Sequence, residues 1–197
     1  ILPVVTLKYG LEGYQLQSLQ AHEGGRNVIY ICEKENAPAY VLRISYQNDR
    51  SREDYLAELE YVRYLYDNGA SVANVISSKE GNLVEELDYN GQLLFICLFE
   101  KARGMQIAEN NYRYRDGAPL SEYFFNCGKT LGKIHQLSKD YQPVHKRYHF
   151  EDKFNRKYID ELLPEKYADL KRGMASVLDE LNSIERTNEV YGMVHCD

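Results

Sequence analysis

The hydrophobic residues of the first hundred positions fall in short runs separated by turn-forming residues, a pattern typical of β-strands. The runs that we expect to form strands are residues 14–19, 28–32, 40–44, 83–87 and 93–99. Gly24-Gly25-Arg26-Asn27 separates the first two runs, and Asn36-Ala37-Pro38 separates the second run from the third. Asn90-Gly91 readily adopts the positive φ angles of a tight turn between the last two runs. The second and third runs, and the last two, therefore predict hairpins.

One helix is predicted inside this β-rich part, where apolar residues recur at steps of three and four. The apolar residues of this helix are Tyr55, Leu56, Leu59, Val62, Leu65 and Tyr66. Ser51 and Asp54 have the spacing of a capping box, in which each side chain bonds the other residue's backbone N–H. Gly69 suits the helix end, because glycine adopts positive φ angles at little cost. A helix is therefore expected over residues 51–68.

The second half of the chain has the apolar spacing of helices. The helices that we expect there are residues 119–138, 150–163 and 170–181. Residues 190–194 predict a short strand that leads into His195-Cys196-Asp197, and residues 105–118 predict a polar connection. Because the strands precede the helices instead of alternating with them, the order predicts an α+β fold or two lobes.

Composition excludes some classes of function. Hydrophobic residues make up 44% and charged residues 27% of the chain, which is ordinary for a globular protein. The net charge of −6, with scattered Lys and Arg, argues against a nucleic-acid binder, because phosphate neutralisation needs clustered cations. No apolar run is long enough to span a bilayer, no signal peptide is visible, and the four cysteines form no CxxC pair. We therefore expect a cytoplasmic protein with reduced thiols.

Several residues are candidates for chemistry, and each also has a plain structural interpretation. The turn from Gly24 to Asn27 could bring backbone N–H groups close to a phosphate, or it could be an ordinary hairpin turn. Arg43, inside the apolar run 40–44, either points into a cleft toward an anion or extends its charge to solvent. Glu58 lies on the following helix beside Leu59, where its plain interpretation is a solvated helix face.

Two further candidates follow the ends of predicted strands. Main-chain groups of residues 100–104, directly after the run 93–99, are free to bond a planar ring, or the segment is a simple connection. His195 and Asp197 place an imidazole and a carboxylate two residues apart, a pair that by itself selects no function. The order of all these features along the chain is more informative than any one of them.

That order resembles the plan of the protein kinases: a glycine turn, a basic residue on the third strand, a helix glutamate, a hinge and a catalytic loop. The details are similar to the aminoglycoside-phosphotransferase family, because there is neither a GxGxxG turn nor an HRD motif. Residues 57–65 with Gly69 to Val72 resemble that family's E…L…L…G…V helix and turn, and residues 131–135 resemble its LG.LH helix. Residues 191–197 resemble the opening of its HGDxxxxN loop. Relatives with similar patterns include choline kinases, type II homoserine kinases, methylthioribose kinases and spore-coat kinase-like proteins.

The resemblance, which covers nearly the whole chain, implies a bilobal protein-kinase-like fold. Residues 1–99 would be an ATP-binding lobe of strands with one long helix, 100–104 a hinge, and 105–197 the first part of a helical lobe. The implied reaction is transfer of the γ-phosphate of ATP to a hydroxyl of a small molecule such as an aminoglycoside, choline or homoserine. The expected partners are therefore ATP and this acceptor, with neither nucleic acid nor membrane.

The resemblance also implies roles for individual residues. The residues implied to bind the nucleotide are Gly24, Gly25, Arg26, Asn27, Arg43, Glu58, Glu100 and Ala102. The glycine turn would cover the phosphates, Arg43 held by Glu58 would contact them, and the backbones of Glu100 and Ala102 would bond the adenine. Asp197 would be the catalytic residue that accepts or orients the proton of the substrate hydroxyl. Mg²⁺ would be required, but its ligands are expected beyond residue 197, so residues 1–197 alone are expected to be inactive.

Two residues depart from the family pattern. Arg43 stands where lysine is usual, and a guanidinium is larger and shaped differently from an ammonium. Cys196 replaces the loop glycine, and its side chain could crowd the loop. The alternative function is therefore a catalytically inactive kinase-like binding or structural protein of the spore-coat type, while the missing motifs disfavour a regulatory protein kinase. Because the chain starts at Ile1 and stops directly after an apolar run, we also expect it to be part of a longer protein.

Overall fold

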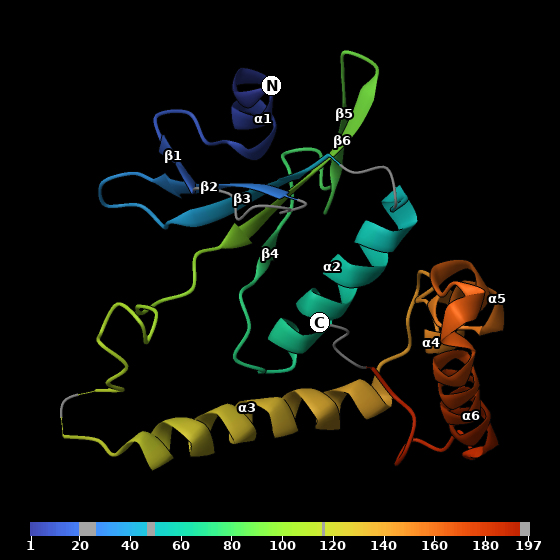
Figure 1. Ribbon diagram of the computed structural model, residues 1–197. Coiled ribbons are helices and arrows are strands. Elements are labelled where there is room, and N and C mark those ends of the chain that lie inside the picture. The colour runs from blue at the N-terminus through green and yellow to red at the C-terminus, as the bar shows by residue number, and fades with distance from the viewer. Residues whose placement is uncertain (20–26, 47–49, 116, 194–197) are drawn as a thin grey trace. The chain divides into compact units, whose positions relative to one another are not determined.

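The computed structural model describes residues 1–19, 27–46, 50–115 and 117–193 (Figure 1). The chain forms two compact units that divide after Lys146. The first unit holds a β-sheet with helices α1, α2 and α3, and the second holds the later helices. The predicted α+β class is confirmed, whereas a division into lobes at residues 100–104 stays a prediction. None of the described helices is both long and apolar enough to cross a membrane.

The described part of the first unit contains a six-stranded sheet in the order β1-β2-β3-β6-β4, in which β5 also pairs with β6. Every one of these pairings is antiparallel. The strands are β1 (Gln15–Leu19), β2 (Asn27–Glu33), β3 (Tyr40–Ser45), β4 (Val75–Ile76), β5 (Glu85–Tyr89) and β6 (Gln92–Glu100). The five predicted runs are confirmed, and Asn90 and Gly91 close the last hairpin with φ angles of 56° and 79°. The two-residue β4 was not predicted, because so short a strand shows no periodicity.

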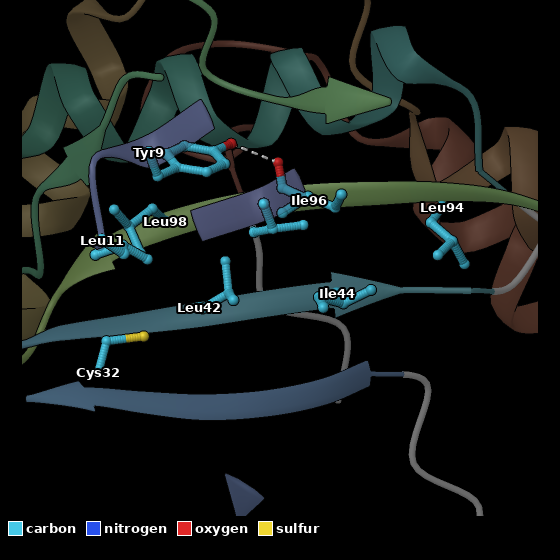
Figure 2. Close-up of a cluster of buried hydrophobic side chains, with 9 residues drawn as sticks. Tyr9, Leu11, Cys32, Leu42, Ile44, Leu94, Ile96 and Leu98 are labelled. Atoms are coloured by element: carbon cyan, nitrogen blue, oxygen red, sulfur yellow. Dashed lines mark hydrogen bonds between the residues drawn. The ribbon is translucent and has the colours of Figure 1, made fainter. Parts of the chain in front are cut away.

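Successive residues of the sheet point to opposite faces and build two separate cores. The core on the α1 (Leu2–Tyr9) side, shown in Figure 2, consists of Val5, Tyr9, Leu11, Cys32, Leu42, Ile44, Leu94, Ile96 and Leu98. The core on the α2 (Arg52–Asp67) side consists of Tyr55, Leu56, Leu59, Val75, Val84, Phe95 and Cys97. Strand β6 alternates between the two cores, so it is the central strand of the unit.

Helix α1 was not predicted from the sequence. Its eight residues include apolar side chains on several sides, with Val5 buried and Leu7 60% exposed, so they show no clear helical stripe. Contact with the sheet places this helix: the Tyr9 hydroxyl donates to the carbonyl of Ile96 at 2.8 Å (Figure 2). Burial raises the pKa of Tyr9. The hydroxyl therefore stays protonated and keeps donating this bond.

Helix α2 begins and ends as its sequence predicts. The backbone N–H of Ser51 donates to Asp54 Oδ2 at 2.7 Å, and the N–H of Asp54 donates to Ser51 Oγ at 3.3 Å, which confirms the capping box. Gly69 follows the helix with a φ of +79°, the left-handed conformation that favours glycine at a helix end. Residues between these signals, including Glu58, therefore have a well-defined position on the helix.

The later helices agree with the predictions except in one place. They are α3 (Leu120–Asp140), α4 (Phe150–Lys153), α5 (Arg156–Leu162), the short 3-10 helix η1 (Glu165–Tyr167) and α6 (Ala168–Ser183). The predictions of helices over 119–138 and 170–181 are confirmed. The helix predicted over 150–163 is divided, because Asn155 accepts the N–H of Tyr158 at 3.0 Å and starts α5 as a new helix.

The strand predicted at 190–194 is wrong for residues 190–193, and residue 194 lies outside the described residues. A strand needs a neighbouring strand to bond its backbone, and within the described part of the chain residues 190–193 pair with none. The N–H groups of Val190 and Tyr191 instead both donate to the carbonyl of Thr187, at 3.1 Å and 2.9 Å, and close a turn. An apolar run alone therefore did not decide the structure here.

Glu85 of β5 forms an ion pair that links the sheet to α1. Its side chain is 5% exposed and accepts a hydrogen bond from Lys8 Nζ at 2.8 Å. Asn82 Nδ2 donates to the same carboxylate at 3.0 Å. Burial raises the pKa of the Glu85 carboxyl, but the hydrogen bonds from Lys8, Ser78 and Asn82 outweigh burial, and the pKa lies below its ordinary value. The ionised form is thus favoured by folding.

This depressed pKa predicts an acid-sensitive part of the stability. Such a carboxylate stabilises the fold above its unfolded pKa of about 4.3, and the contribution is lost as the pH falls through the lower folded pKa. We expect Glu85→Gln to cost about 1–2 kcal/mol in free energy of unfolding at pH 7 and to weaken the acid dependence below about pH 4. Urea denaturation at pH 7 and below pH 4 measures both, with the exposed neighbour Glu86→Gln as the matched control. An unchanged acid dependence in Glu85→Gln would contradict this account.

Candidate functional site

The candidate site is centred on Arg43 of β3. Arg43 is paired with Cys97 of β6, and Cys97 belongs to the core on the α2 side, so both side chains point to that face of the sheet. Glu58 of α2 lies one turn from the buried Tyr55 and projects toward the same place. Arg43 Nη1 donates to Glu58 Oε1 at 2.7 Å, with the two side chains 17% and 26% exposed. The structure thus brings together two predicted site residues that are fifteen positions apart in the sequence.

The Arg43 guanidinium lies over two aromatic rings, Tyr55 and Phe99, and these residues with Cys97 are called the slot. Its Cζ atom is 5.1 Å from the ring centroid of Phe99 and 5.8 Å from that of Tyr55. The Cys97 Sγ atom lies 3.8 Å from Nη2. Planar guanidinium groups stack well on aromatic faces and lysine ammonium groups do not match that shape. Arg43 is therefore suited to this slot in a way that lysine would not be.

Both ionisable groups in the slot keep their ordinary charge at neutral pH. Burial lowers the pKa of Arg43, but the charge of Glu58 opposes it and the pKa lies above its ordinary value. Burial raises the pKa of the Cys97 thiol to about 11, although Arg43 opposes that shift. The slot therefore holds a guanidinium cation and a neutral thiol.

Glu58 also binds a second arginine, which sequence analysis missed. Arg50 Nη1 lies 3.2 Å from Glu58 Oε2, and its side chain is 46% exposed. The contacts of Arg43 with Tyr55, Cys97 and Phe99 were not predicted either, although all three residues were expected in regular elements. No local pattern marks Arg50, because it precedes the helix and belongs to no periodic run.

The predicted hinge residues follow the end of β6. The backbone N–H of Glu100 donates to the carbonyl of Asn74 at 2.8 Å, and the N–H of Lys101 donates to Ala39 at 2.9 Å. The Glu100 N–H is therefore occupied, and a ring at this position could bond only the carbonyl of Glu100. Among the described residues, the N–H of Ala102 donates to no backbone carbonyl, so it remains open to such a ring.

The other predicted site residues are only partly described. Asn27 is the first residue of β2, and its Oδ1 accepts a hydrogen bond from the Ser45 hydroxyl at 2.6 Å. Gly24, Gly25, Arg26 and Asp197 lie outside the described residues. In the part of the chain that is described, no group of three or more His, Cys, Asp or Glu side chains is placed to hold a metal ion. The site geometry therefore rests on Arg43, Glu58 and their neighbours.

Comparison with known proteins supports the kinase resemblance. Residues 18–197 match the sequence model of the phosphotransferase enzyme family, APH. Amicoumacin kinase of Bacillus subtilis (strain 168) is 29% identical over 201 aligned residues, covering 100% of this chain and 56% of the relative. The chain therefore spans little more than half the length of that curated relative.

Two solved structures show the same fold. The amicoumacin kinase hAmiN, in complex with AMP-PNP, Ca²⁺ and Ami, superposes with a TM-score of 0.79 at 24% identity, covering 98% of this chain and 56% of that chain. The microcompartment-associated aminopropanol kinase superposes with a TM-score of 0.70 at 17% identity, covering 96% of this chain and 59% of that one. The expected protein-kinase-like fold is confirmed by these likenesses.

Proposed function

Because this chain belongs to the phosphotransferase enzyme family, we propose that the whole protein transfers the γ-phosphate of ATP to a hydroxyl of a small molecule. The observation that carries the proposal is the Arg43–Glu58 ion pair, which joins β3 to α2 at 2.7 Å. Phosphoryl transfer depends on positioning and charge stabilisation, and a fixed guanidinium is a suitable group to meet phosphate oxygens. The proteins compared above are named as amicoumacin kinases and an aminopropanol kinase.

The residues of the described site fit a nucleotide. Arg43 remains cationic, and its buried Nε atom has no hydrogen-bond partner among the described residues. At the end of β6, the Glu100 carbonyl and the Ala102 N–H form an acceptor and a donor two residues apart, as an adenine edge requires. We assign the phosphates to the Arg43 side, next to the predicted turn of Gly24, Gly25, Arg26 and Asn27, and the adenine to residues 100–102.

Asp197 is the proposed catalytic base, which would accept or orient the proton of the acceptor hydroxyl. Base catalysis of this kind contributes about 10²–10⁴-fold to the rate. A divalent cation such as Mg²⁺, when bound, would neutralise charge on the phosphates. We propose that its ligands lie outside the described residues, which hold no metal-binding cluster.

The acceptor is proposed to carry an amine as well as a hydroxyl. The solved relative named for aminopropanol acts on a molecule that has both groups, and the net charge of −6 favours a cationic partner. Aminoglycosides, choline and homoserine share this combination of hydroxyl and positively charged nitrogen. They define the class in which to search for the substrate.

Nucleotide binding is the first test of this function. We expect ATP at about 100 times its Kd to stabilise the whole protein by about 2.7 kcal/mol, because a ligand that binds the folded state alone stabilises it by mass action. Thermal denaturation with and without ATP and Mg²⁺ measures this, and a coupled ADP-release assay then identifies the acceptor. ATP binding without turnover of any hydroxylated amine would favour the inactive kinase-like protein, the alternative that the departures at Arg43 and Cys196 suggest.

A further inference from the structure

The Glu58 carboxylate is shared between two arginines. Its Oε1 atom lies 2.7 Å from Arg43 Nη1, and its Oε2 atom lies 3.2 Å from Arg50 Nη1. Two guanidinium groups around one carboxylate leave one positive charge that Glu58 does not neutralise. A charge of this kind, partly removed from water, favours an anion nearby.

The two arginines differ in how many donors they can offer. Arg43 is 17% exposed, its Nη1 and Nη2 atoms bond Glu58 and Cys97, and only its buried Nε has no partner among the described residues. Arg50 is 46% exposed and, among the described residues, makes a hydrogen bond to Glu58 alone. A guanidinium has five N–H donors in a rigid plane. Arg50 therefore keeps more donors available to a ligand in solvent than Arg43 does.

The topology places Arg50 near the end of the sheet where β2 starts, directly after the predicted glycine turn. β2 starts at Asn27 and β3 ends at Ser45, and these two residues are paired across the strands. Arg50 follows β3 and directly precedes Ser51, the N-cap of α2. Its guanidinium is held toward the slot, with Cζ 6.0 Å from the ring centroid of Tyr55. Both the strand ends and the Glu58 contact thus direct Arg50 to the phosphate side of the site.

We propose that Arg50 is a phosphate-binding residue of the nucleotide site, additional to the strand residue Arg43. This inference rests on the proposed nucleotide-binding function and names a further contact in the same site. Arg43 fixes Glu58 against the sheet, and Glu58 in turn orients Arg50, whose exposed N–H groups meet the phosphates. Guanidinium groups bind phosphate through two parallel hydrogen bonds, which lysine cannot form. The planar guanidinium of arginine is therefore important at position 43 as well as at position 50.

The test compares ligands with and without phosphates on the whole protein. We expect Arg50→Ala to raise the Kd for ATP about tenfold, while the Kd for adenosine changes less than about twofold, because only the phosphate contact is removed. Arg50→Lys should lose part of the ATP affinity and none of the adenosine affinity. Arg52→Ala removes the same charge from an exposed position two residues away and should leave both Kd values unchanged. Isothermal titration calorimetry measures all of these, with melting temperatures to verify folding.

Several results would overturn the inference. Equal losses of ATP and adenosine affinity in Arg50→Ala would mean that Arg50 acts through the fold, and unchanged ATP affinity would mean that it touches no phosphate. An equal loss of ATP affinity in Arg52→Ala would mean that the effect comes from the net charge of this surface and not from a contact of Arg50 with phosphate. If Arg50→Ala fails to fold, Arg50→Lys provides the test. A loss of ATP affinity without a loss of adenosine affinity would support the phosphate contact, and equal losses would contradict it. A wild-type protein that binds no ATP would instead refute the proposed function. Failure of the function can therefore be distinguished from failure of the inference about Arg50.

Discussion

Replacing Asp197 by asparagine in the whole protein is expected to lower kcat by about 10²–10⁴-fold, the usual contribution of a general base. Asparagine has nearly the same shape but cannot accept the hydroxyl proton, so the substitution removes chemistry and leaves size unchanged. The KM for ATP should change little, because the proposed nucleotide contacts come from Arg43, Arg50 and residues 100–102. Steady-state kinetics with an identified acceptor measures both constants.

Asp179→Asn provides the matched control for this experiment. Asp179 lies on α6, its side chain is 65% exposed, and it pairs with Arg156 at 2.7 Å. Exposed pairs of this kind contribute about 0–1 kcal/mol to stability, so kcat should stay at the wild-type value. An Asp197→Asn enzyme with more than about a tenth of wild-type kcat would exclude Asp197 as the base.

The second large effect is expected at Glu58. Glu58→Gln leaves the Arg43 cation in its slot without a negative partner, and breaking a buried ion pair in this way costs about 3–5 kcal/mol. Because the two side chains are still 17% and 26% exposed, we expect a smaller loss of about 2 kcal/mol in the free energy of unfolding. ATP affinity should fall as well, since both arginines lose their orientation. Urea denaturation and calorimetric titration with ATP measure the two effects.

Controls can separate the stability of the pair from its function. Glu53→Gln removes the same charge from an exposed position in the first turn of α2 and should cost less than about 1 kcal/mol. The double variant Arg43→Met with Glu58→Leu should recover much of the lost stability, because apolar residues of similar size can replace a buried ion pair. Its ATP affinity should nevertheless stay low. Recovery of ATP binding in the double variant would show that the pair is structural and not part of the nucleotide site.

The departure from lysine at position 43 has a structural explanation. Phe99 and Tyr55 flank the guanidinium at 5.1 Å and 5.8 Å, and Cys97 faces it across the strands. Lysine would carry the charge, but its ammonium group would not stack on the two rings as a planar guanidinium does. Arginine at position 43 therefore does not by itself indicate an inactive protein.

Local patterns in the sequence were sufficient for most of the secondary structure. Strand runs, the capping box of Ser51 and Asp54, and the Asn90-Gly91 turn depend on neighbouring residues, so the sequence contains their causes directly. The order of these elements, with Arg43 on the third strand and Glu58 on the next helix, was enough to indicate the family. These were the features that the sequence determined by itself.

Other elements depend on contacts that no local pattern contains. α1 is stabilised as a helix by the sheet beneath it, through Val5 and the Tyr9 bond to Ile96, and its own residues lack a helical stripe. Residues 190–193 are apolar enough for a strand but pair with no neighbour in the described structure, so they form a turn. A long-range contact thus stabilises α1, whereas residues 190–193 lack a partner strand in the described structure and close a local turn instead.

The candidate site likewise combines residues that the sequence predicted with contacts that only the tertiary structure formed. The sequence alone indicated Arg43 and Glu58 as site residues, because the family's order of strands and helices can be followed along the chain. Only the tertiary structure brought them to 2.7 Å, placed Cys97 and Phe99 of β6 against the guanidinium, and added Arg50 to Glu58. Such contacts follow from strand register and from the packing of α2 on the sheet, which join residues as far apart in the sequence as Arg43 and Phe99. The sequence therefore determined which residues to examine, and the packing of a helix on a sheet decided how they meet.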